Sequence, residues 1–268
     1  MKYFTVKKAY AALCLLPFLA ACNPQLQANA QEKLPKERFT ADDAVGSLGG
    51  IPLRMSGYIF LSFPEYEDTP YGLSKEWETY DPPPRTLESP LRVFSIGWNI
   101  KTDELYDLRN QTMYDYSDSA AKPENPWVDF AFRAGKIPSS DFLNKSLEID
   151  LDKDNIPPYR YRKTGRVLYG LEEYEPLAEH SLGGSDNLFI GRDKNGNVIT
   201  YISCFNNNKN ESINPPCTHD FLWKDNLYIN FRASYSKFYL KDWRKIEHKS
   251  KEILEEFKDN AKHPERKL

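Results

Sequence analysis

The hydrophobic period of the chain changes once near its C-terminus, and this change limits the folds that the chain can adopt. In residues 227–235 apolar and polar side chains alternate, as in a strand that buries one face. The side predicted to be buried comprises Leu227, Ile229, Phe231, Ala233 and Tyr235. In residues 243–257 apolar positions recur every three or four residues, which is the period of an amphipathic helix. The buried side of this helix is predicted to comprise Trp243, Ile246, Ser250, Ile253, Leu254 and Phe257.

Several upstream segments have the composition or the alternation of strands. The predicted strands are residues 51–63, 91–100, 127–134, 143–151 and, with a weaker pattern, 160–174. Residues 110–125 are polar and are predicted to form a surface loop. Asn195 and Gly196 stand between two apolar runs and predict a β-hairpin, because both residues tolerate positive φ. We therefore predict an α+β fold that is mainly antiparallel β-sheet, with the C-terminal amphipathic helix packed on it.

The N-terminus has the pattern of an export signal. Lys2, Lys7 and Lys8 precede an apolar stretch at 9–20, and small residues then lead to Cys22. The stretch is shorter than the roughly 20 residues that a membrane-spanning helix needs. Residues 19–22, Leu-Ala-Ala-Cys, resemble the lipobox of bacterial lipoproteins. This resemblance implies cleavage before Cys22 and attachment of lipid to it.

The lipobox implies a membrane anchor rather than a membrane span. Asn23 stands where retention in the inner membrane favours Asp, so the sorting rule for these lipoproteins implies the outer membrane, facing the periplasm. The alternative is an ordinary secretory signal in which Cys22 carries no lipid. The predicted organisation is a signal peptide at 1–21, a lipid-anchored flexible tether at 22–48, one globular α+β domain or two packed β-rich halves at 49–260, and a frayed tail at 261–268.

The charge of the chain argues against nucleic acid as a partner. Without the signal peptide the formal net charge falls from −3 to −6, because Lys2, Lys7 and Lys8 are lost. Phosphate binding needs clustered Lys and Arg, and the chain has no basic run outside its C-terminal tail. Contact with the membrane is therefore expected to come from the N-terminal lipid.

Cysteine usage fits an oxidising compartment. Cys14 lies in the predicted signal peptide and Cys22 is the predicted lipid site, which leaves Cys204 and Cys217 to form a disulfide. Together with His219 these two thiols would offer three zinc ligands, but a fourth ligand is not apparent and a disulfide would consume the thiols. We predict the disulfide, a structural His219 and no bound metal.

The sequence lacks the local signatures of a hydrolase. Gly183, Gly184 and Ser185 form a Gly-rich turn rather than a nucleophile motif. Residues 150–155 are acidic but lack the central Gly and terminal Glu of a calcium-binding loop, so we predict a solvated turn. No cofactor motif is visible, and we predict that the chain is not an enzyme.

Residues 65–80 combine acidic and aromatic side chains in a Pro-containing loop. Tyr and Trp are common anchors of protein interfaces, and clustered acids steer a basic partner. The predicted partner-binding residues are Glu65, Tyr66, Glu67, Asp68, Tyr71, Trp77 and Tyr80. The alternative is an acidic surface with buried tyrosines.

The order of motifs along the chain resembles one protein family. The motifs are the lipobox, the strand segment 49–60, the PPPRT segment that opens residues 82–95, Cys204 with residues 217–219, and the strand and helix of 234–257. They are similar to the lipoproteins found beside type VI secretion phospholipase effectors, which act as immunity partners. The resemblance implies a lipid-tethered protein that binds a secreted phospholipase-type toxin and occludes its active site, with no catalytic residues of its own. The alternative is an envelope-assembly or structural outer-membrane lipoprotein without a toxin partner.

Overall fold

The computed structural model of the 268-residue chain describes residues 43–268, except 71–73, 120, 121, 123, 137, 158, 179–184, 207–214 and 224–227. The predicted signal peptide, Cys22 and most of the predicted tether lie outside the described residues. Within the described part, no helix is both long and apolar enough to cross a membrane.

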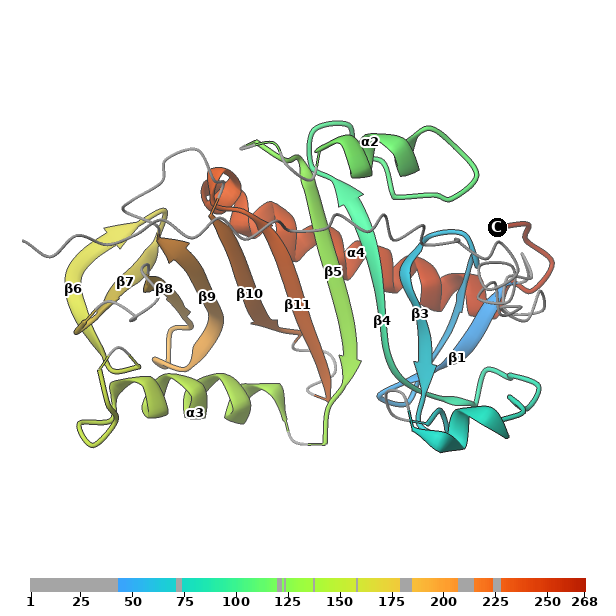
Figure 1. The fold of residues 1–268 in the computed structure, drawn as a ribbon, viewed down its shortest axis with the longest axis horizontal. Helices are drawn as coiled ribbons and strands as arrows, with labels where there is room; N and C mark the ends of the chain where they lie inside the picture. The colour runs from blue at the N-terminus through green and yellow to red at the C-terminus, as the bar shows by residue number, and fades with distance from the viewer. Residues whose placement is uncertain are drawn as a thin grey trace, which may run out of the picture. The chain divides into compact units, whose positions relative to one another are not determined.

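A single eleven-stranded sheet organises the fold (Figure 1). Its strands are β1 (Ala44–Leu48), β2 (Ile51–Met55), β3 (Phe60–Tyr66), β4 (Pro90–Asn99), β5 (Trp127–Ala134), β6 (Tyr161–Leu168), β7 (Leu171–Pro176), β8 (Ser185–Arg192), β9 (Val198–Asn206), β10 (Pro216–Leu222) and β11 (Ile229–Ser236). They are ordered β2-β1-β4-β5-β11-β10-β9-β8-β7-β6, and β3 pairs with β4. The pairings are antiparallel except for the short parallel pair β1–β4.

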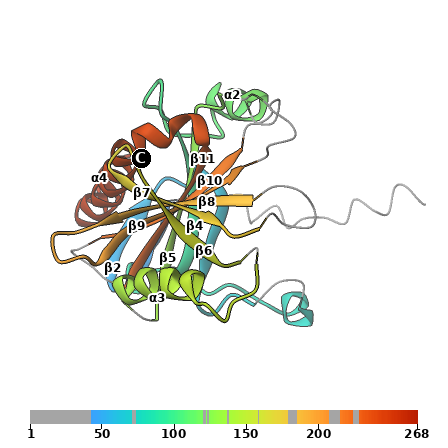
Figure 2. The same cartoon turned by 90° about the vertical axis from the view of Figure 1, so that its left-hand side faces the viewer.

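The C-terminal helix α4 (Trp243–Lys262) covers one face of this sheet, following the 3-10 turn η3 (Lys237–Asp242). Figure 2 shows α4 on one side of the strands. All six positions predicted to form its buried side are buried. The core between helix and sheet is rich in aromatic rings, including Phe94, Phe132, Phe231 and Phe257. The predicted fold class, a mainly antiparallel sheet with a packed C-terminal helix, is therefore confirmed.

The helix α3 (Ser139–Leu151) packs on the opposite face of the sheet. Two neighbouring residues of β9 show this, because Thr200 donates a hydrogen bond to Glu247 of α4 whereas Tyr201 donates one to Asp150 of α3. A shorter helix, α2 (Thr112–Ser119), and the 3-10 turn η2 (Lys75–Glu78) complete the helical elements named here.

Two predicted segments contain a helix where a strand or a loop was expected. Residues 143–151 were predicted as a strand but belong to α3, in which Leu143 and Leu147 are buried against the sheet while Ile149 is 54% exposed. Leu143 and Leu147 are four positions apart, a spacing that fits both the strand and the helix period. The alternation therefore did not distinguish a strand from a helix. Residues 110–125, predicted as a loop, contain α2.

Residues 51–63, predicted as one strand, form the two strands β2 and β3, with 56–59 between them. Pro64 lies inside β3 rather than ending it, in a stretch where the register with β4 is irregular. Proline lacks the N–H that a regular ladder requires, which fits such an irregular position.

The folded part extends beyond its predicted limits at both ends. The last five residues of the range predicted as tether form β1, which pairs with β2. Arg54 of β2 donates to the carbonyl oxygens of His263 and Arg266 at 3.0 and 2.8 Å, so the segment predicted to fray is bound to the sheet. Arg54 also forms an ion pair with Asp43, just before β1.

Candidate protein-binding face

The sheet face opposite α4 carries polar and short side chains over its four central strands. Residues alternate between the two faces along a strand. The residues next in sequence to the buried Phe94, Phe132, Phe231 and His219 therefore point to this side. We call it the open face and define it by Val93, Ser95, Asp129, Ala131, Arg133, Asn230, Arg232, Ser234, Thr218 and Asp220, all half-buried or exposed. In Figure 2, α2 and the segment of η2 project on the side of the sheet away from α4.

At the α2 end of the open face, an aromatic corner surrounds a carboxylate. Tyr106, Tyr116 and Trp127 meet in edge-to-face contacts, with ring centroids 5.4 and 5.5 Å apart. The Tyr116 hydroxyl donates to Oδ2 of Asp129 at 3.0 Å. Burial among these groups raises the pKa of Asp129 to about 6, and the Tyr116 hydrogen bond offsets the rise only in part. Oδ1 of Asp129 is buried and has no hydrogen-bond partner among the described residues.

At the α3 end, the open face runs into a pocket of about 310 Å³. Its lining residues are Phe142, Leu143, Ser146, Ile149, Asp150, Tyr201, Asp220 and Arg232. Arg232 binds Asp220 through two hydrogen bonds of 2.9 and 3.0 Å, so these charges balance one another. The pocket therefore combines apolar side chains of α3 with neutralised polar groups of the sheet.

The predicted acidic loop begins within the last residues of β3, and Glu65, Glu67 and Asp68 are exposed but partly neutralised. Asp68 accepts two hydrogen bonds of 2.9 Å from Arg85, and Glu65 pairs with Arg92 at 3.5 Å. Arg92 also donates to the carbonyl oxygen of Glu67 at 2.9 Å. The two arginines thus hold the loop in shape and reduce its negative field. Residues 65–89 still contain seven acidic residues against Lys75 and Arg85.

The aromatic residues predicted as anchors in this loop have different fates. Tyr66 is only 8% exposed, with its hydroxyl bound to the Val45 carbonyl oxygen and its ring under the Arg85 guanidinium at 3.8 Å, so it supports the loop from inside. Trp77 and Tyr80 are half-buried and pack edge to face at 5.6 Å. Tyr71 lies outside the described residues. The alternative of buried tyrosines therefore holds for Tyr66.

The predicted disulfide between Cys204 and Cys217 is present and joins the facing strands β9 and β10. His219, two residues along β10, is fully buried, with Tyr235 at 3.3 Å from Nδ1 and Glu247 of α4 at 3.2 Å from Nε2. Glu247 also accepts from Thr200 at 2.6 Å. This network joins the sheet to α4 and gives His219 a structural place. The described residues contain no cluster of three or more potential metal ligands.

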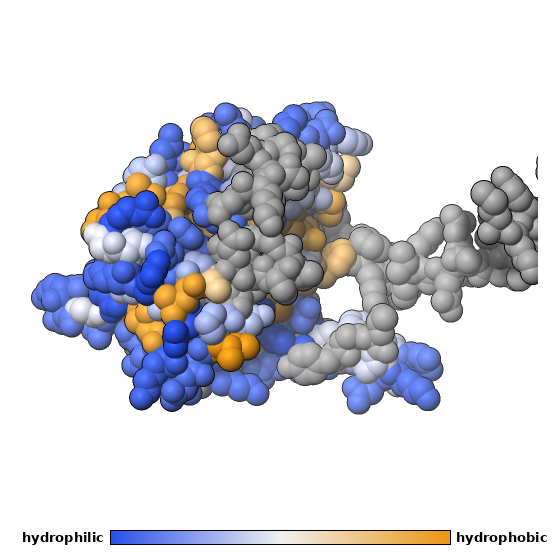
Figure 3. Space-filling model, turned by 60° about the vertical axis from the view of Figure 1, so that its left-hand side comes forward, coloured by the Kyte–Doolittle hydropathy of each residue, from blue (hydrophilic) through white to orange (hydrophobic). Residues whose placement is uncertain are grey.

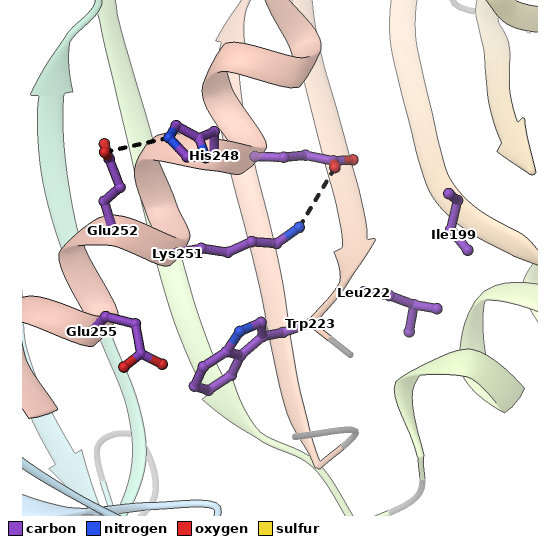
Figure 4. A pocket seen from close by; sticks show the side chains of 8 residues that line it. Ile199, Leu222, Trp223, His248, Lys251, Glu252 and Glu255 are labelled. Atoms are coloured by element: carbon purple, nitrogen blue, oxygen red, sulfur yellow. Dashed lines mark ion pairs between the residues drawn. The ribbon is translucent and has the colours of Figure 1, made fainter. Parts of the chain in front are cut away.

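A groove of about 690 Å³ lies beside α4 (Figure 4), at a place that no sequence motif indicates. Ile199, Leu222 and Trp223 line its sheet side, while the helix supplies Glu247, His248, Lys251, Glu252 and Glu255. His248 pairs with Glu252 at 3.3 Å and Lys251 with Glu247 at 3.8 Å. The lining residues include no hydroxyl or thiol, and at least two of the charged side chains are held in ion pairs.

On the coloured part of the face in Figure 3 most residues are hydrophilic, with hydrophobic patches among them. Comparisons with known proteins add one likeness. No protein-family model matches the chain, and no curated protein matches it in sequence. The chain shares its fold with a solved immunity protein. That protein is Smlt3025, an immunity protein of the Stenotrophomonas maltophilia type IV secretion system, with a TM-score of 0.50 and 12% sequence identity. The match covers 81% of this chain and 94% of Smlt3025.

Replacing Asp129 by asparagine is expected to raise the free energy of unfolding at pH 8 by about 2 kcal/mol. The pKa of Asp129 rises from 3.8 to about 6 on folding. Each pKa unit corresponds to about 1.4 kcal/mol of stability, and solvent screening of this half-buried group reduces the total. Because the folded state holds the proton more tightly than the unfolded chain, the wild type loses stability relative to the variant as the pH rises from about 4 to 6. Urea unfolding at pH 4 and pH 8 measures this difference.

The matched control is Asp118→Asn, which removes the same charge from an exposed position on α2. It is expected to leave the free energy of unfolding within about 0.5 kcal/mol of the wild type at both pH values. Equal stability of Asp129→Asn and the wild type at pH 8 would show that Asp129 is not desolvated in the folded protein.

Proposed function

We propose that this protein binds a secreted antibacterial toxin and neutralises it. The observation that carries the proposal is the shared fold with Smlt3025, whose name identifies it as an immunity protein of a secretion system. The open face supports it, since its residues are half-buried or exposed, with a pocket of mixed apolar and polar lining at one end and an aromatic corner at the other. Such a mixture of aromatic anchors and polar groups suits a protein interface.

The toxin is proposed to be a phospholipase effector of a type VI system, which the protein inhibits by occluding its active site. This finer assignment rests on the motif resemblance of the sequence, from the lipobox to residues 234–257. The neighbour in fold belongs to a type IV system, so it supports toxin neutralisation without bearing on the type of secretion or the lipase. An inhibitor needs no catalytic residues, because it acts by covering the toxin.

We further propose that Cys22 is acylated and holds the protein at the outer membrane, facing the periplasm. A tethered inhibitor has a high effective concentration where a lipase would meet phospholipid. Metabolic labelling with a palmitate analogue is expected to mark the wild type and not Cys22→Ser. Equal labelling of both proteins would place the lipid elsewhere or show that there is none.

The proposed function is tested by capture. The full chain, extracted from membranes in mild detergent, is incubated with the secreted proteins of the same cells, and bound proteins are identified while phospholipase activity is followed. Stoichiometric recovery of one secreted toxin with loss of its activity is the expected result. Capture of outer-membrane assembly proteins instead would favour the alternative of an envelope-assembly lipoprotein.

Reversing the charge of Glu65, Glu67 and Asp68 to lysine is expected to slow association with the captured toxin by about tenfold at low salt. Clustered acids accelerate encounter with a basic partner, and this effect weakens as salt screens it. Stopped-flow association at two ionic strengths measures the change. The control reverses Glu252, Glu255 and Glu256, three exposed acids of α4. An unchanged association rate in the loop variant would remove the loop from the interface.

A further inference from the structure

Asp129, Asp150 and Asp220 lie on the side of the sheet away from α4, and the last two are satisfied by neighbours. Asp220 is bound by the Arg232 guanidinium, and Asp150 accepts a hydrogen bond from the Tyr201 hydroxyl. Asp129 differs, because Tyr116 satisfies Oδ2 while Oδ1 is buried without a hydrogen-bond partner among the described residues. No basic side chain in the described part of the chain contributes to the pKa of Asp129.

The strand register leaves Asp129 approachable from one direction. On the β4 side it faces Gly97, above which Tyr106 packs so closely that a Cβ on Gly97 would lie 3.1 Å from the Tyr106 Cβ. On the β11 side it faces Ser234, and Thr218 of β10 is next in the same row. Both are short and half-buried, so we expect a side chain that lies along this row to come beside Asp129.

We propose that Asp129 is the anchor on the open face for a lysine or arginine side chain of a protein partner. An incoming ammonium or guanidinium would donate to the unpartnered Oδ1 of Asp129. The proposal deepens the proposed function, and the partner that it concerns is the toxin.

Charge and desolvation favour a cation over other occupants of this corner. A desolvated carboxylate without a counter-charge is unfavourable in the free protein, and the raised pKa of Asp129 reflects this. A basic side chain of the partner removes this penalty on binding, so the charge pair with Asp129 adds favourably to the binding free energy. The chain as a whole is also acidic, with a formal net charge of −3. A metal ion is a poorer occupant, because the described residues offer no cluster of three ligands.

The test compares the affinity of wild type, Asp129→Asn and Asp118→Asn for the captured toxin at pH 7.5. Asp129→Asn keeps the size of the side chain and is expected to weaken binding at least about tenfold, whereas Asp118→Asn is expected to change it less than twofold. The Asp129→Asn protein is also expected to be more stable than the wild type, so weaker binding could not be attributed to unfolding. A toxin bound equally by Asp129→Asn would overturn the anchor while leaving the proposed function intact.

If the capture experiment recovers no toxin, a model ligand decides the question. N-acetyl-arginine amide is titrated into the full chain at pH 7.5 while NMR follows the carboxyl carbon of Asp129. The expected result is a saturable shift of this carbon and of the Ser234 amide, in the wild type and in Asp118→Asn. In Asp129→Asn the Ser234 amide is followed alone, and it is expected not to shift. Shifts of equal size in the Asp129→Asn protein would overturn the proposal, whichever class of protein the chain proves to be.

Discussion

Replacing Phe94 by alanine is expected to lower the free energy of unfolding by about 4 kcal/mol, the largest effect predicted for a single side chain here. Phe94 lies in the middle of β4, is fully buried, and stacks on Phe132 of β5 with ring centroids 4.8 Å apart. It also meets the edge of Phe60 at 6.0 Å and the ring of Phe257 at 6.2 Å. Its removal leaves a cavity where β3, β4, β5 and α4 meet, and rigid neighbours cannot fill it.

Urea unfolding followed by tryptophan fluorescence measures this loss. Tyr114→Ala is the control, because that ring is 57% exposed on α2 and its truncation is expected to change the free energy by less than about 0.5 kcal/mol. A Phe94→Ala protein as stable as the control would mean that α4 does not pack on the sheet as described.

Removing the disulfide is expected to lower the free energy of unfolding by about 3 kcal/mol, the value of the chain-entropy model for a loop of this length. Cys204 and Cys217 are separated by 13 positions and face each other across β9 and β10, so the bond closes a loop in the unfolded chain. Both residues are fully buried, and replacing both by alanine avoids a buried polar group.

The comparison is the double variant Cys204→Ala, Cys217→Ala against the oxidised wild type, with the reduced wild type as control. The reduced protein is expected to unfold close to the urea midpoint of the double variant. A midpoint equal to that of the oxidised wild type would show that the loop between the two cysteines is already constrained in the unfolded state.

The open face changes how the acidic loop is understood. The loop was expected to hold both the anchors and the steering charge, yet Tyr66 supports it from inside and Arg85 and Arg92 balance part of its charge. Asp129, in contrast, stands in a segment whose alternation predicted only a half-buried strand. Its function as an anchor would depend on neighbours from β4, β11 and α2, which no local pattern reveals.

Local patterns were enough to predict the elements whose side chains repeat with one period over enough residues. The alternation near residues 229–235 became β11, the three-to-four spacing of residues 243–257 became α4, and Asn195 with Gly196 formed the hairpin turn, where Gly196 has a φ of 87°. The disulfide followed from counting cysteines on the expectation of an oxidising compartment. Each of these features is caused by residues close together in the sequence or by the composition of the chain.

The remaining features arise from tertiary contacts, because strand order, register and partner groups depend on residues far apart in the chain. Leu143 and Leu147 fit two periods, and packing against the buried side chains of β8 to β10 favours the helix α3. Tyr66 is buried because Arg85 and Val45 meet it, 19 and 21 positions away. Asp129 lacks a counter-charge because the register places Gly97 and Ser234 beside it. Such contacts arise when the sheet assembles, and no stretch of sequence contains them.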